Sequence, residues 1–153
     1  MLNLETIRAA KKRIEKYILP KELKKSVLFN DVVLYLKLEC TQLTNSFKLR
    51  GALSKMTTLT EAEKAFGIMT TSSGNHGAAV SYGSQLLNIE KVDIIVPKVT
   101  PQSKIDNIEQ YGGNVLVMGD NYDETHQMGE VYKEEHKLTY IDAYYEDEAV
   151  YAG

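Results

Sequence analysis

Four short apolar runs, separated by longer helical patterns, occupy the sequence from residue 68 onward. The runs are IMTT at 68–71, VDIIV at 92–96, NVLVM at 114–118 and LTYI at 138–141. Helical patterns begin near Asn75, Pro101 and Tyr122, in the stretches between the runs. Strands that alternate with helices at this spacing pair in parallel through right-handed crossovers. The sequence therefore predicts an α/β fold with one open parallel sheet and helices on both faces.

The helix ends are marked by residues that bind free backbone groups. Thr60, three residues before Glu63, predicts a capping box, and Gly67 is expected to end that short helix. Thr100 is expected to cap a later helix whose first residue is Pro101. These signals place two of the helices between predicted strands.

The first forty residues predict a helix followed by a strand. Asn3 is the expected N-cap of an amphipathic helix that runs to about Ile18, before Pro20. The run VVLYLKLE, residues 32–39, is predicted as a strand with its leucines on one face.

Charge and cysteine content exclude several classes of function. The net charge of -3 gives no electrostatic basis for binding nucleic acid or an anionic membrane surface. Cys40 is the single cysteine, and the start of the chain lacks the apolar core of a signal peptide, so a cytoplasmic protein is expected. The histidines and Cys40 show no metal-ligand spacing, and no metal is predicted.

One lysine has an unusual setting within TNSFKLRGAL, residues 44–53. Lys48 lies between Phe47 and a glycine, at the expected start of a helix. Most lysines are solvated surface groups, and that interpretation is open here. Partial desolvation beside an aromatic ring and a positive helix end would instead favour the neutral amine, which forms Schiff bases.

A second stretch, TTSSGNHG at residues 70–77, lies at the first junction from strand to helix in the predicted sheet. Ligands of open α/β sheets bind at the carboxyl ends of strands, where helix N-termini present free N–H groups. Ser72, Ser73 and Asn75 offer polar groups there, and Gly74 permits a close backbone approach. The same residues also suit a plain turn and helix cap.

Together, SFKLRGA and SSGNHG resemble the threonine dehydratase and serine racemase branch of the fold-type-II pyridoxal phosphate (PLP) enzymes. The similarity continues through LTEAEKAFGIMTTSSGNHGAAVSYGSQLLNI, PKVTPQSKIDNIEQYGGNVLVMGDNYDET and AVYAG, so it covers nearly the whole chain. Cysteine synthases of that superfamily tend to have Asp-Arg after the lysine and Thr after Gly-Asn, where this chain has Leu49-Arg50 and His76. The resemblance thus implies a deaminase or racemase, and it is greatest to catabolic threonine dehydratase.

The resemblance implies PLP as the cofactor and L-threonine or L-serine as the substrate, with a 2-oxo acid and ammonia as products. Lys48 would hold the cofactor and remove the α-proton of the substrate. Asn75 would hydrogen-bond the phenolic oxygen of the ring. Phe47 would pack beside that ring, although simple core packing explains it equally well.

The resemblance also implies a site for the substrate carboxylate at the helix N-terminus, formed by Ser72, Ser73, Gly74, Asn75 and His76. Ser73 would have a second use in a racemase-like enzyme, where it would act on the face of the substrate opposite Lys48. A conservative departure is Asn45, which stands where the family often has glycine and tolerates a left-handed backbone.

The main departure is length, because chains of this family are roughly twice as long and exceed the usual single-domain size. The part without a counterpart here carries the glycine-rich phosphate loop and the group that faces the pyridine nitrogen. Gly112-Gly113 is expected at a helix end and not as that loop. Residues 1–51 would contribute to the large domain that holds the PLP lysine, and residues 52–153 would form the small domain.

Two functions follow from the resemblance and remain open. The chain is either part of a PLP-dependent ammonia-lyase, acting as a homo-oligomer or with a complementing C-terminal half, or a non-catalytic fragment of such an enzyme that serves as an interaction module for full-length relatives. In both cases, apolar surface around Val32 to Leu38 is expected to be uncovered.

Overall fold

The computed structural model describes residues 2–28, 30–143 and 148–153. Its centre is a four-stranded sheet in the order β5-β4-β3-β6, and every strand pair is parallel. The strands are β3 (Ile68–Thr71), β4 (Val92–Val96), β5 (Asn114–Val117) and β6 (Thr139–Tyr140). All four predicted runs therefore contribute a strand, and the predicted parallel sheet is confirmed.

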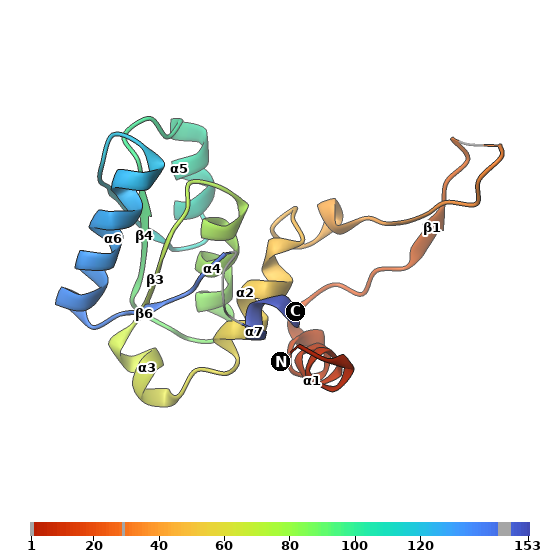
Figure 1. Cartoon of the computed structure of the whole chain (residues 1–153), viewed down its shortest axis with the longest axis horizontal. Helices are drawn as coiled ribbons and strands as arrows, with labels where there is room; N and C mark the ends of the chain where they lie inside the picture. Colours follow the sequence, from red (N-terminus) through yellow and green to blue (C-terminus); the bar gives the residue numbers. More distant parts are fainter. Residues whose placement is uncertain (1, 29, 144–147) are drawn as a thin grey trace.

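Helices cover both faces of this sheet, as predicted (Figure 1). Helices α4 (Asn75–Leu86) and α5 (Gln102–Glu109) lie on one side, and α6 (Tyr122–His136) lies on the other. The larger apolar core, which includes Ile68, Ile94 and Val80, lies on the α4 side, and a smaller one around Met69 and Ile95 lies on the α6 side. The two central strands, β3 and β4, are buried on both faces, which explains their continuous apolar runs, whereas β5 and β6 at the edges are partly exposed.

Two predicted helix starts have different outcomes. Helix α3 (Glu61–Phe66) has the predicted capping box between Thr60 and Glu63, and Gly67 ends it with a φ of 105°. The prediction that Thr100 caps α5 is wrong, because Pro101 is the N-cap residue and α5 begins at Gln102. Pro101 has the extended ψ of 142° that an N-cap residue adopts, so the helix starts one residue later than predicted.

The N-terminal segment departs further from the prediction. Helix α1 (Leu4–Ile14) has the expected Asn3 cap but ends in a 3-10 turn, η1 (Glu15–Tyr17), before it reaches Ile18. The predicted strand at 32–39 shortens to β2 (Tyr35–Lys37), which pairs antiparallel with β1 (Leu23–Lys25).

These two strands form an arm that projects away from the rest of the molecule (Figure 1). The arm and its tip expose large apolar side chains, as expected for the region around Val32 to Leu38; these are Leu23, Val27, Leu28, Val32, Val33, Tyr35 and Leu36. Packing within the described residues does not stabilise this surface.

A helix joins the N-terminal segment to the sheet. After the 3-10 turn η2 (Glu39–Thr41), helix α2 (Lys48–Met56) packs against α4 and against the short C-terminal helix α7 (Glu148–Tyr151). The proposed domain boundary at residues 51 and 52 falls inside α2, whose Leu49 shares one core with Ile14 and Ile68. Among the described residues, no helix has the length and apolar character needed to cross a membrane.

Candidate functional site

A cleft of about 460 Å³ lies at the carboxyl ends of β3 and β6. It brings the Lys48 segment and the turn after β3 together, although they are two dozen residues apart in sequence. All the residues predicted for the site line this cleft, together with three that were not predicted; the full lining is Phe47, Lys48, Thr71, Ser72, Ser73, Gly74, Asn75, His76, Tyr122 and Ala143.

The backbone before α2 directs Lys48 into the cleft. Gln42 is buried, and its side-chain amide makes two hydrogen bonds with the backbone of Leu19. Its Oε1 accepts from the N–H of Leu19 at 2.8 Å, and its Nε2 donates to the carbonyl of Leu19 at 3.1 Å. Asn45 then takes a left-handed φ of 54°, which asparagine tolerates better than most residues. The backbone N–H of Lys48 donates to the hydroxyl of Ser46 at 3.2 Å, and Lys48 is the first residue of α2.

The amine of Lys48 is half-buried and faces polar and aromatic groups. Its Nζ donates to the carbonyl of Ala143 at 3.3 Å and lies 5.2 Å from the ring centroid of Phe47. Phe47 is 60% exposed, so the core-packing interpretation of this residue is wrong. The structure instead places the ring beside the amine of Lys48, at the edge of the cleft.

The turn after β3 presents an uncapped helix N-terminus to the same cleft. Gly74 is the N-cap of α4, and no side chain caps its first turn. The N–H groups of Asn75 and His76 therefore have no partner within the helix, and they carry the positive end of its dipole. The hydroxyl of Ser72 accepts a hydrogen bond from the N–H of Gly74 at 3.3 Å, which orders the turn. This geometry suits a carboxylate.

The side chain of His76 is buried and links the turn to the backbone after β6. It is 3% exposed, and its Nε2 donates to the carbonyl of Ile141, just after β6, at 2.9 Å. Burial lowers the pKa of His76 to about 4, and the positive charge of Lys48 acts in the same direction. The imidazole is therefore neutral at pH 7 and couples α4 to the end of β6, so a ligand would meet the backbone N–H of His76.

We expect the buried His76 to make the protein less stable in mild acid. The unfolded chain binds a proton on this residue below about pH 6.5, whereas the folded chain does so below about pH 4. The contribution of His76 is therefore complete above pH 6.5 and is lost as the pH falls toward 4, by about 3 kcal/mol in total. Urea unfolding across this range measures the loss, and His76→Gln should flatten the pH dependence. An identical pH dependence in His76→Gln would contradict this account.

Two glycines of the turn make a matched pair for testing its packing. A Cβ at Gly77 would lie 2.5 Å from the carbonyl oxygen of Ser72 and 3.0 Å from the Ile94 side chain, whereas a Cβ at Gly74 would meet nothing within 4 Å. We expect Gly77→Ala to lower the free energy of unfolding by about 1–3 kcal/mol and Gly74→Ala to change it by less than about 0.5 kcal/mol. Equal urea midpoints for the two variants would show that α4 does not depend on this close approach.

Three lining residues escaped prediction from the sequence. Thr71 is the last residue of β3, Tyr122 is the first residue of α6, and Ala143 follows β6. The available signal was position, because the carboxyl ends of parallel strands meet at one edge of the sheet. Across the described ranges, no three or more histidine, cysteine, aspartate or glutamate side chains are grouped as they would be to hold a metal ion.

Comparisons with known proteins agree with this arrangement. The model of the family described as "Pyridoxal-phosphate dependent enzyme" matches residues 19–153. The chain is 35% identical over 157 aligned residues to the catabolic L-threonine dehydratase TdcB of Staphylococcus aureus strain USA300, covering 100% of this chain and 45% of that protein. It is 44% identical over 94 residues to the biosynthetic L-threonine dehydratase IlvA of Salmonella typhimurium strain LT2, covering 61% and 18% of the two chains.

Solved structures show the same similarity. Maize serine racemase superposes with a TM-score of 0.91 at 27% identity, covering 99% of this chain and 46% of that one. The processed form of threonine deaminase isoform 2 from Solanum lycopersicum superposes with a TM-score of 0.87 at 31% identity, covering 99% and 43%. The chain thus spans less than half the length of these full-chain matches.

Proposed function

Because the chain belongs to the family of pyridoxal-phosphate-dependent enzymes, we propose that its cleft is part of the active site of an L-threonine or L-serine ammonia-lyase. The observation that carries this proposal is the meeting of one amine, on Lys48, with the uncapped N-terminus of α4 in a single cleft. The similarity to threonine dehydratases supports the choice of substrate.

The residues of the cleft fit one end of the cofactor. Lys48 supplies the amine that would hold PLP covalently, Phe47 supplies an aromatic wall beside it, and Asn75 is exposed at the start of α4, where its amide can reach a ring oxygen. When bound, PLP withdraws electrons from the bond between the α-carbon of the amino acid and its hydrogen. The protein supplies the orientation and the proton transfer.

Lys48 is the proposed base. Its Nζ donates a hydrogen bond to the carbonyl of Ala143, which also lines the cleft, and its place as the first residue of α2 fixes where the side chain starts. The neutral amine would take the α-proton of the substrate on Nζ. Loss of the β-hydroxyl as water and later hydrolysis would convert L-threonine into 2-oxobutanoate and ammonia.

The turn after β3 is the proposed site for the substrate carboxylate. Ser72, Ser73, Asn75 and His76 line the same cleft as Lys48, so the N–H groups of Asn75 and His76 and the two serine hydroxyls are the donors that would bind the carboxylate. An anion held there gains from the helix dipole and from several N–H donors at once. Holding the carboxylate fixes the direction in which the α-hydrogen points. Such positioning supplies a large part of the rate enhancement that a site of this kind can achieve.

The described residues supply no glycine-rich anchor for the phosphate of PLP. Gly113 is packed so closely that a Cβ would lie 2.2 Å from the Ser81 hydroxyl, and Gly112 has a φ of 81° after the end of α5. Gly113 thus permits close packing, and Gly112 follows the end of a helix, as expected. We propose that a complementing C-terminal half, continuous or separate, provides the phosphate anchor and covers the apolar arm formed by β1 and β2.

A racemase is the second candidate, and it is favoured by Ser73 in the cleft and by the similarity to solved serine racemases. A chimera separates the candidates. In this chimera the part of S. aureus TdcB that follows the aligned region continues from Gly153. Formation of 2-oxo acid from L-threonine supports the lyase, and formation of D-serine from L-serine, measured by chiral chromatography, supports the racemase. The absence of both from a folded chimera that binds PLP would indicate a non-catalytic fragment.

A further inference from the structure

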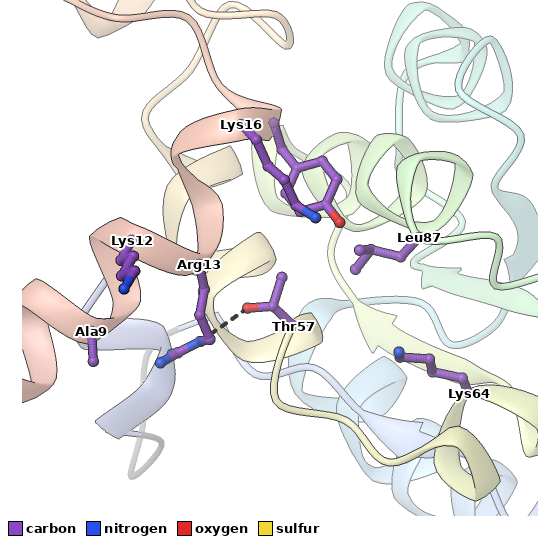
Figure 2. Close-up of a pocket in the computed structure, with 8 residues that line it drawn as sticks. Ala9, Lys12, Arg13, Lys16, Thr57, Lys64 and Leu87 are labelled. Carbon is purple, nitrogen blue, oxygen red and sulfur yellow. Dashed lines mark hydrogen bonds between the residues drawn. The ribbon is translucent and has the colours of Figure 1, made fainter.

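A second cleft, of about 650 Å³, lies where α1 and η1 approach the end of α2, the last turn of α3 and the end of α4. Figure 2 shows it, and its lining shares no residue with the Lys48 cleft. The lining residues are Ala9, Lys12, Arg13, Lys16, Tyr17, Thr57, Lys64 and Leu87. Its size falls within the range typical of small-molecule sites. We call it the basic cleft.

The charges of the basic cleft are all of one sign. Four of its eight lining residues are Lys or Arg and none is acidic, although the whole chain has a net charge of -3. Arg13 and Lys64 are half-buried. The acids near these cations lie outside the lining: Glu61, 90% exposed, pairs with Lys64 at 2.7 Å, and Glu148 lines an adjacent hollow that Arg13 also borders. Cations gathered in a concave surface focus a positive potential and attract anions.

The donors of the basic cleft suit an oxyanion. The Nε of Arg13 donates to the hydroxyl of Thr57 at 3.4 Å (Figure 2). Figure 2 also shows the ammonium groups of Lys16 and Lys64 extending toward the same space. Arginine binds phosphate oxygens with a fixed fork, and lysine adds a point charge.

Part of the lining is apolar. Leu87 contributes to it, and the ring of Tyr17 lies under the ammonium of Lys16 at 4.7 Å. Inorganic phosphate would leave this wall and much of the volume unused. We propose that the basic cleft binds a small organic phosphate, with the phosphate group among Arg13, Lys16 and Lys64 and the organic part against Tyr17 and Leu87. This site is independent of the proposed activity.

Phenyl phosphate is the probe, because it combines a dianionic phosphate with a compact apolar body. Titration of the purified chain by calorimetry, at constant ionic strength, is expected to give saturable binding with a Kd of about 1 mM or tighter. Arg13→Gln and Lys16→Gln should each weaken it by about tenfold, because charge-assisted hydrogen bonds are lost. The matched control is Lys104→Gln, because Lys104 is an exposed residue of α5. This substitution should change the Kd by less than about twofold.

Two further ligands test the chemical class. Inorganic phosphate should bind at least about fivefold more weakly than phenyl phosphate if the apolar wall contributes. Vesicles of phosphatidylcholine that contain phosphatidic acid should not sediment with the chain. Equal affinities for the two phosphates would overturn the proposal, and so would equal changes in Kd caused by Arg13→Gln and Lys104→Gln. Binding to the vesicles that depends on Arg13 would also overturn it, because it would assign the cleft to a membrane surface. Circular dichroism of each variant verifies its fold, and Lys16 is exposed, so its replacement keeps the test available if Arg13→Gln unfolds.

Discussion

Replacement of Lys48 by alanine in the chimera is expected to lower the rate of 2-oxobutanoate formation from L-threonine by about 10³-fold or more. In the proposed mechanism the change removes both the covalent hold on the cofactor and the base for the α-proton, and no other lysine among the described residues lines the cleft. The rate is measured by coupling 2-oxobutanoate to its reduction by a dehydrogenase and following the loss of NADH.

Lys104→Ala provides the control for this experiment, because Lys104 is exposed on α5 and lies outside the cleft. It should keep the rate within about twofold of the parent, as is usual for surface changes away from a site. A Lys48→Ala chimera with the same rate as the Lys104→Ala chimera, and with an unchanged circular dichroism spectrum, would remove Lys48 from the mechanism.

The isolated 153-residue chain should deaminate L-threonine at least about 100-fold more slowly than the chimera. Lys48 would give the cofactor one attachment point, and the described residues supply no glycine-rich anchor for its phosphate, so the ring would pivot about that attachment. A displacement of about 1 Å at the reacting centre already costs a factor of this size. The measurement compares both proteins at equal concentrations of active chain and saturating PLP.

Efficient, Lys48-dependent turnover by the isolated chain would contradict this expectation. It would mean that copies of the chain assemble and rebuild a phosphate site from residues of two protomers. Sedimentation velocity during the assay identifies such an assembly, because the exposed arm of β1 and β2 is the apolar surface through which self-association is expected.

The sheet was predictable from the sequence because its central strands, β3 and β4, are buried on both faces. Such strands carry continuous apolar runs, and the helices between them carry local end signals such as Thr60 and Gly67. The arm was not predictable, because the run 32–39 alternates as a strand does but cannot identify its partner, β1. The start of α5 was misplaced by one residue because proline fits both the N-cap and the first helical position.

The site was predictable in its parts but not in its assembly. The setting of Lys48 and the composition of the turn after β3 are visible locally in the sequence. The hydrogen bond from Lys48 to Ala143 and the position of Tyr122 depend on strand order and on the path of α6, which local patterns do not encode. His76 shows the same limit, because the sequence places it in the turn but does not reveal that its ring is buried against Ile141.

The most direct test of the central claim is to locate the lysine that PLP reaches. The chimera is incubated with PLP, reduced with borohydride to fix the cofactor to that amine, and digested for mass spectrometry. The account predicts that Lys48 carries the label, that saturating L-threonine added before reduction decreases it, and that labelling at the exposed Lys12 and Lys16 stays minor. Labelling spread equally over Lys12, Lys16 and Lys48, and unaffected by L-threonine, would contradict the assignment of this cleft as the cofactor site.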